Sequence, residues 1–523
     1  MAEVLERKST VRIRGRTLRP DPRVLREGRA GMKLLALAGA VIVVGNANAQ
    51  VFTVRPSIYS RLTYSDNASA TEGGGGDWVA EITPGIAVAR DRGRVTGSLD
   101  ARLRSTMHGN DSERDSTFVA MQGQGQVEAV EDVLFVDMSA SISRNNTSDL
   151  RGRATQDFLS TDSANETRVF SLGPRLHFRL GAGPQGVASY RMNWLDGGGG
   201  ILSRTVANTR GQLSDPQAFG RGGWSLDYSR VDTRYDEVAN SEVTEEVVRA
   251  TMFLRVSPEF RLRAIAGHES NEYSVRSGES GTITGAGFDW NPTPRTALSA
   301  TAEDRIFGRG YYLNFNHRRP LSWWDVSYSR DISSSLQTNG SVFDDPAFRS
   351  LFDALADEIP DLFEREVLVR QQLGYPALGV RDTFVTNNYF LARTLRGSVS
   401  LLGARNVLTF SLQRTERSRL GDPFVSDPRD DLAVFDAVTT RSATVSLSHS
   451  LSPAASLNTS LVRSYAEGRG ADDAETRRTT FSLGLSTRLG RRTAGSLTYR
   501  HQRATGASDF RENILTASLG MQF

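Results

Sequence analysis

Arginine and carboxylate residues that alternate with apolar residues have the clearest capacity for chemistry in this sequence. In several stretches the charged residues share one parity and the aliphatic residues the other, the pattern of a strand with one wet and one apolar face. If the wet face lines a lumen, its guanidinium groups favour anionic solutes or uronate-bearing glycans. The candidate lumen-lining residues are Asp100, Arg102, Arg104, Arg175, Arg179, Arg249, Arg255, Arg261 and Arg263.

A second interpretation of the same arginines is structural. Carboxylates of the same parity could pair with the arginines and brace the wall, without acting on any solute. The expected partners are Asp100, Asp137, Asp227, Glu303 and Asp325.

Other reactive residue types are sparse or scattered. The chain has no Cys and six His, and the His residues show no metal-ligand spacing. No Gly-x-Ser-x-Gly elbow accompanies an acid and a His in order. We therefore predict no enzyme, no cofactor and no metal site.

Three acidic stretches are expected in loops, where they could hold Ca²⁺ or Mg²⁺ bridged to lipopolysaccharide phosphates. Solvated loops are the simpler interpretation. Their acids are Asp232, Asp236, Glu237, Glu242, Glu245 and Glu246, then Asp422, Asp427, Asp430, Asp431 and Asp436, then Asp472, Asp473 and Glu475.

Composition limits the class of protein. The chain has 523 residues, 48 Gly, 24% charged residues and a mean hydropathy of −0.37, which argues against a helical membrane protein. A β-barrel needs apolar residues at only every second strand position, so it tolerates this value. The formal net charge is +3, but the basic excess lies in the first 49 residues. Bulk charge therefore predicts no nucleic-acid partner.

The N-terminal region has the pattern of a secretory leader. Met32-Lys33 precedes an apolar run from Leu34 to Gly45, and Ala47-Asn48-Ala49 follows as a small-x-small site. We predict a signal peptide over 32–49, cleaved after Ala49, and an upstream extension or mis-assigned start over 1–31. The mature chain would then be 50–523.

From Val51 onward, alternating segments recur between polar connections that are long and short in turn. This arrangement predicts an all-β, antiparallel transmembrane barrel of roughly 22 strands, with short turns at the periplasmic side. The terminal stretch Asn513–Phe523 alternates and ends in an aromatic residue. It resembles the closing strand of bacterial outer-membrane barrels, which implies that Phe523 is an assembly signal read by the barrel-assembly machinery.

One segment departs from the period of two. Over about 340–385 the apolar residues are spaced by three and four, which predicts a helical insertion in an outer loop, as a plug helix or a self-packed helix pair. Its apolar stripe comprises Phe348, Leu351, Phe352, Leu355, Ile359, Leu362 and Phe363.

Short motifs at the start of the mature chain suggest a family. Arg55-Pro56-Ser57-Ile58, Tyr64-Ser65-Asp66-Asn67 and Pro84-Gly85-Ile86 resemble the opening of Gram-negative outer-membrane β-barrels associated with exopolysaccharide production and the PEP-CTERM/exosortase system. Ser65 stands where that family is expected to have Thr. The resemblance implies an outer-membrane location and a role in polysaccharide or surface-protein export, with no catalytic residues.

These observations leave four functions open. The protein is expected to be a conduit or docking element in exopolysaccharide or surface-protein export. The alternatives are an interaction barrel with a closed lumen and a general porin for anionic solutes. A soluble carbohydrate-binding β-protein is the last alternative. Expected partners are outer-membrane lipid and lipopolysaccharide, the barrel-assembly machinery, and polysaccharide or periplasmic export proteins.

Overall fold

The structure is a computed structural model. It describes residues 52–90, 92–150, 164–198, 200–236, 242–274, 277–333, 384–423 and 427–523, together with Phe352, Arg365 and Val369. The chain separates into two compact units, Met1–Val51 and Phe52–Phe523. The predicted signal peptide and upstream extension fall in the first unit, outside the described residues.

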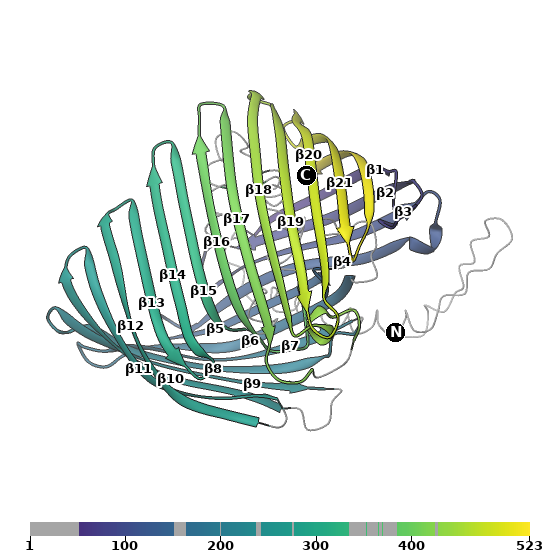
Figure 1. The fold of residues 1–523 in the computed structure, drawn as a ribbon. Helices are drawn as coiled ribbons and strands as arrows, with labels where there is room; N and C mark the ends of the chain where they lie inside the picture. The colour runs from purple at the N-terminus through teal and green to yellow at the C-terminus, as the bar shows by residue number, and fades with distance from the viewer. Residues whose placement is uncertain are drawn as a thin grey trace, which may run out of the picture. The chain divides into compact units, whose positions relative to one another are not determined.

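The second unit is one closed antiparallel sheet of 22 strands, as the alternation predicted (Figure 1). Each strand pairs with the next along the chain, and β1 pairs with β22 to close the wall. The strands are β1 (Thr53–Ser65), β2 (Asp77–Arg90), β3 (Val95–His108), β4 (Ser116–Val130), β5 (Leu134–Asn146), β6 (Ala164–Arg179), β7 (Gln185–Gly197), β8 (Arg204–Phe219), β9 (Gly222–Tyr235), β10 (Glu242–Ser257), β11 (Phe260–Ser274), β12 (Ser277–Thr293), β13 (Thr296–Arg305), β14 (Gly308–Arg319), β15 (Ser322–Ser333), β16 (Phe390–Leu402), β17 (Asn406–Arg419), β18 (Ala437–Ser452), β19 (Ala455–Arg469), β20 (Ala474–Gly490), β21 (Thr493–Gly506) and β22 (Phe510–Gln522).

The two faces of the wall differ in polarity. Leu461, Leu483 and Leu515 stand on one parity and are 40–47% exposed, whereas Ser446 and Ser448 on the other parity are buried. Large apolar side chains on the outside and small polar side chains on the inside invert the arrangement of a water-soluble sandwich. The wall is therefore built for an apolar solvent outside and a polar lumen inside.

The seam between the terminal strands holds the barrel closed. Ser57 through Ser65 pair in register with Gln522 through Ile514, and the Phe523 N–H donates to the Pro56 carbonyl at 2.9 Å. The ring of Phe523 is 59% exposed. Phe523 thus extends the seam through its backbone, while its side chain stays on the surface.

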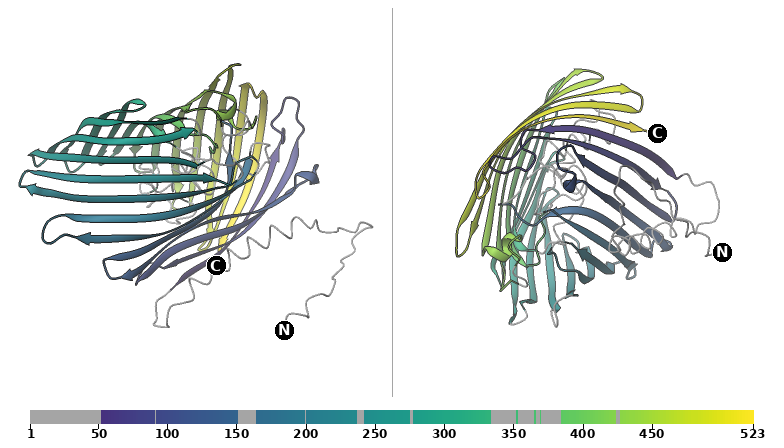
Figure 2. Two further views of the ribbon diagram at one scale, coloured as in Figure 1. Left: turned by 90° about the horizontal axis from the view of Figure 1, so that it is seen from below. Right: turned by 90° about the vertical axis from the view of Figure 1, so that its right-hand side faces the viewer.

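Connections of two kinds alternate along most of the chain (Figure 2). Turns such as 131–133 and 491–492 lie at one end, with the start of β1 and the end of β22, and the long connections 334–389 and 420–436 lie at the other. We call these the turn end and the loop end. Two connections at the loop end, 275–276 and 306–307, are short and so depart from this alternation. Here β11 pairs with β12, and β13 with β14, as far as the connection itself.

Helix is scarce in the described ranges. The structure defines the 3₁₀ turn η1 (Ser112–Arg114) and the short helix α5 (Asp431–Val434). Among the residues it describes, no helix is long and apolar enough to cross a bilayer. The predicted helical insertion lies almost wholly outside the described residues. Within it the structure describes Phe352, Arg365 and Val369, each in a helical conformation, so the insertion stays a prediction.

Candidate functional site

The wet face of the wall carries pairs of opposite charge, and most candidate lumen residues belong to them. Arg102 and Asp100 lie two residues apart along β3, and Arg249 reaches from β10 to Glu303 on β13, whereas the other pairs join adjacent strands. The closest N–O distances are 2.8 Å for Arg102–Asp100, 2.9 Å for Arg104–Glu81, 2.8 Å for Arg175–Asp137, 3.0 Å for Arg249–Glu303, 2.7 Å for Arg261–Asp289 and 3.3 Å for Arg263–Asp289. These arginines brace the wall.

Glu81 anchors the most buried of these clusters. Its side chain is 4% exposed and accepts from Arg104 and from the Thr83 hydroxyl at 3.0 Å, while Arg61 lies 3.5 Å away. Sequence reasoning missed Glu81, although it shares the polar parity of β2 with Asp77 and Thr83. Alternation alone could have found it, because Trp78 and Ile82 occupy the other face.

Other ion-pair partners are set by the pairing register between strands, which the sequence of a single strand does not reveal. Asp289 pairs with Arg261 directly across the β11–β12 ladder, and Glu269 pairs with Arg305 two strands away. Asp227 lies opposite Arg249 across the β9–β10 ladder, as expected, but it accepts hydrogen bonds from Gln212 at 2.7 Å and Ser225 at 3.0 Å, while Arg249 forms its ion pair with Glu303.

A second group of arginines lies at the turn end without a carboxylate. Arg179, Arg255 and Arg488 occupy the polar parity of β6, β10 and β20, and no ion pair to any of them occurs in the part of the chain that the structure describes. Arg488 also lines a cavity at the turn end, together with Arg102, Arg491 and Arg492. This mouth of the lumen therefore presents unneutralised guanidinium groups.

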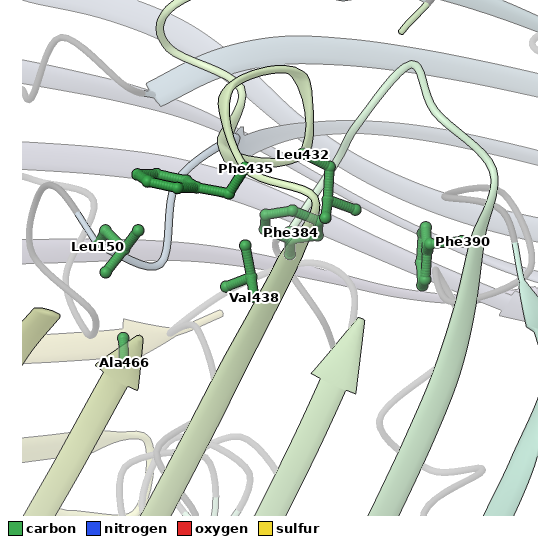
Figure 3. Close-up of a cluster of buried hydrophobic side chains, with 7 residues drawn as sticks. All are labelled: Leu150, Phe384, Phe390, Leu432, Phe435, Val438 and Ala466. Atoms are coloured by element: carbon green, nitrogen blue, oxygen red, sulfur yellow. The ribbon is translucent and has the colours of Figure 1, made fainter. Parts of the chain in front are cut away.

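At the loop end, four segments pack together inside the wall. They are 147–150, 200–202, 384–389 and 430–435, and we call them the loop cap. Leu150, Phe384 and Leu432 are at most 3% exposed and form one apolar cluster (Figure 3). Phe435, Phe390, Val438 and Ala466 complete this cluster, so the cap is anchored on strands β16, β18 and β19.

Two adjacent carboxylates hold three of these segments together. Asp430 is the N-cap of α5 and accepts from the Thr386 hydroxyl at 2.7 Å and from the Leu432 N–H at 3.0 Å. Asp431 accepts from the Ser148 hydroxyl and the Asp149 N–H, both at 2.6 Å. The expectation that these acids lie in a solvated loop is wrong, because they are 2% and 4% exposed.

Asn387 connects the fourth segment. Its side chain accepts from the Leu202 N–H and donates to the Gly200 carbonyl, each at 2.8 Å. Gly200 has a φ of +101°, and a Cβ there would collide with Asp427. These bonds join the β7–β8 connection to the residues before β16, which lie far around the wall, so the cap crosses the mouth of the lumen.

Burial changes the acidity of the cap carboxylates. It raises the pKa of Asp430 from 3.8 to about 6 and that of Asp431 to about 7, since the charged form loses hydration. Asp427 differs, because hydrogen bonds from Arg429 hold the pKa of its carboxyl below the usual value. The cap thus contains two acids that titrate near neutral pH.

The acidic stretches are not gathered into a metal-type cluster where the structure describes them. In the described ranges no group of three or more His, Asp or Glu residues could hold a metal ion. Glu242, Glu245 and Glu246 were expected in a loop but lie in strand β10.

Comparisons with known proteins concern the fold alone. No protein-family model matches the chain, and no curated protein matches it in sequence. Among solved structures, it is similar to the siderophore receptor PirA from Pseudomonas aeruginosa (10% identity, TM-score 0.45, 91% of this chain and 82% of that one). It is also similar to a mutant of the ferric enterobactin receptor PfeA from the same organism (10%, 0.49, 92% and 81%) and to the FrpB iron transporter from Neisseria meningitidis (9%, 0.48, 90% and 81%).

Proposed function

We propose that this protein is an outer-membrane barrel of a Gram-negative bacterium that passes anionic solutes or acidic glycan segments through its lumen. The observation that carries the proposal is the set of unneutralised arginines at the turn-end mouth, Arg179, Arg255 and Arg488. Fixed guanidinium groups at a pore mouth raise the local concentration of anions and bind carboxylate or phosphate oxygens.

The apolar outer face supports the membrane location. Leucine, phenylalanine and tryptophan side chains are exposed around the wall, where water contact would be unfavourable and hydrocarbon contact favourable. The loop end faces outward from the cell in this orientation, since short turns lie on the periplasmic side of bacterial barrels.

Ion selectivity in planar bilayers tests the proposal. Changing Arg179, Arg255 and Arg488 to Ser should move the reversal potential in a salt gradient towards cation selectivity, because three unpaired positive charges leave the mouth. The matched control is Arg102→Ser with Asp100→Ser, which removes one paired charge of each sign. Equal reversal potentials for the triple variant and the unchanged protein would reject a role in anion passage.

A closed-lumen interaction barrel is the second candidate, and the loop cap favours it. Breaking the cap with Asp430→Ala and Asp431→Ala removes the bonds to 147–150 and 384–389. If the cap gates a conduit, this variant should conduct more than the unchanged protein, while the exposed pair Asp472→Ala and Asp473→Ala should not change conductance. No conductance in either variant would favour the closed barrel.

Export of exopolysaccharide or surface protein is the finer proposal. It rests on the resemblance of the first strands to PEP-CTERM-associated barrels and on the polar lumen. The acidic segments of such a polymer would meet the turn-end arginines first on leaving the periplasm. A deletion strain that keeps its full surface polysaccharide and its sorted surface proteins would remove this proposal.

A further inference from the structure

Seven consecutive strands each place an exposed arginine on the outward face, towards the loop end. They run from β16 to β22 without a gap. We call them the arginine band, and they are Arg393, Arg414, Arg441, Arg463, Arg477, Arg503 and Arg511.

The band lies at one level, directly beyond the apolar belt. Strand pairing aligns Arg441 with Tyr465, Tyr465 with Arg477, and Arg503 with Arg511. On the same parity, within four residues towards the turn end, each strand carries an apolar or aromatic side chain. These are Leu395, Leu412, Val445, Leu461, Phe481, Tyr499 and Leu515.

The band contains direct like-charge pairs. Arg414 lies opposite Arg441, and Arg503 lies opposite Arg511. Like charges facing each other across a ladder destabilise a sheet. An anion bound between the two guanidinium groups of such a pair would relieve their repulsion.

Carboxylates neutralise only part of the band. Glu416 lies 3.3 Å from Arg393 and 3.5 Å from Arg414, and Glu475 lies 2.9 Å from Arg477. Arg463, Arg503 and Arg511 have no ion pair within the described ranges. Their planar guanidinium groups are free to bind phosphate with two parallel hydrogen bonds.

The opposite arc of the wall is neutralised by its own acids. At the loop end of β6 and β9, Arg168 pairs with Glu166 at 2.7 Å and Arg230 with Asp232 at 2.9 Å. Glu246 lies 3.7 Å from Arg230 as well. The outward arginines of these two strands are thus neutralised, unlike Arg463, Arg503 and Arg511 of the arginine band.

We infer that the arginine band binds the phosphate groups of a phosphorylated glycolipid of the outer leaflet, with the acyl chains on the apolar belt beneath. A ligand of this surface must place anionic groups at the arginine band and hydrocarbon chains on the adjacent apolar belt. A soluble polyanion has no hydrocarbon chains, so it does not fit this surface. Because arginine supplies the positive charge, binding needs no bridging divalent cation. This inference rests on the proposed outer-membrane location and orientation, and it is independent of what the lumen passes.

Native mass spectrometry of the detergent-purified protein with bisphosphorylated lipid A tests the inference. Binding should persist in EDTA and weaken about tenfold for lipid A without phosphates and for Arg503→Gln with Arg511→Gln. The control Arg168→Gln with Arg230→Gln should bind like the unchanged protein. Inorganic phosphate at equal concentration should neither bind nor compete. Equal affinity for dephosphorylated lipid A, loss of binding in EDTA, or an equal effect of the control would each overturn the proposal.

Thermal stability gives a second readout that misfolding cannot imitate. In detergent without lipid A, Arg503→Gln should raise the melting temperature of the barrel or leave it unchanged, since a like-charge contact is removed. With lipid A present, the same variant should melt below the unchanged protein, because it loses ligand stabilisation. A lower melting temperature in both conditions would contradict a phosphate site.

Discussion

At the scale of single residues, burial decides whether a charge in the lumen is structural. Glu81 and Arg104 have side chains only 4% exposed, whereas Asp100 beside Arg102 is 42% exposed. Removing one partner of a buried pair leaves the other charge without compensation, while an exposed pair is screened by water.

The first prediction compares these two carboxylates. Glu81→Gln should lower the free energy of unfolding by about 3 kcal/mol, because Arg61 and Arg104 remain buried without their anion. Asp100→Asn should change it by less than about 1 kcal/mol. Urea unfolding in lipid vesicles measures both, and equal losses would show that burial does not rank the pairs.

A second residue-scale prediction concerns pH. Because the pKa values of Asp430 and Asp431 are raised to about 6 and about 7, the cap is most stable at low pH. It loses stability as the pH rises through those values and the buried acids ionise. Hydrogen exchange of 384–389, corrected for the intrinsic rate, should therefore be slower at pH 5 than at pH 8. Asp430→Asn with Asp431→Asn should abolish the difference; a difference that persists would assign it to other groups.

At the scale of elements, the sequence predicts strands well and the loop cap poorly. In β22, Leu515, Leu519 and Met521 alternate with Thr516 and Ser518. Each residue type indicates whether its side chain faces an apolar or a polar solvent, so the local sequence suffices to predict the strand. The cap depends on contacts such as Ser148 with Asp431, far apart in sequence. A partial signal existed, since Asp430 precedes the apolar run Leu432 to Phe435 as an N-cap does.

The third prediction separates two roles of the terminal residue. Phe523→Ala keeps the backbone bond to Pro56 and exposes little new surface, so the folded barrel should lose less than about 1 kcal/mol. If Phe523 is the assembly signal, the amount of barrel in the outer membrane should nevertheless fall strongly. Refolding in detergent and quantification in isolated membranes provide the two readouts. Normal membrane levels would remove the signalling role.

At the scale of the whole molecule, two solvents explain the sequence pattern. Hydrocarbon outside and water inside require opposite polarity on the two faces of one wall, which gives a negative mean hydropathy together with many exposed leucines. The strand number followed from counting segments between turns. The pairing of Arg261 with Asp289 did not follow, because it requires the register between strands.

The most direct measurement of this account is a cysteine scan along β5, since the natural chain contains no Cys. In lipid vesicles, single cysteines at Asp137, Ser139 and Ser141, which are partly exposed on the inner face, should react with a water-soluble maleimide. Cysteines at Met138, Ala140 and Ile142 should resist it, and fluorophores there should be quenched by brominated acyl chains. Uniform labelling along the strand, or quenching on the opposite parity, would contradict a wall that separates hydrocarbon from water.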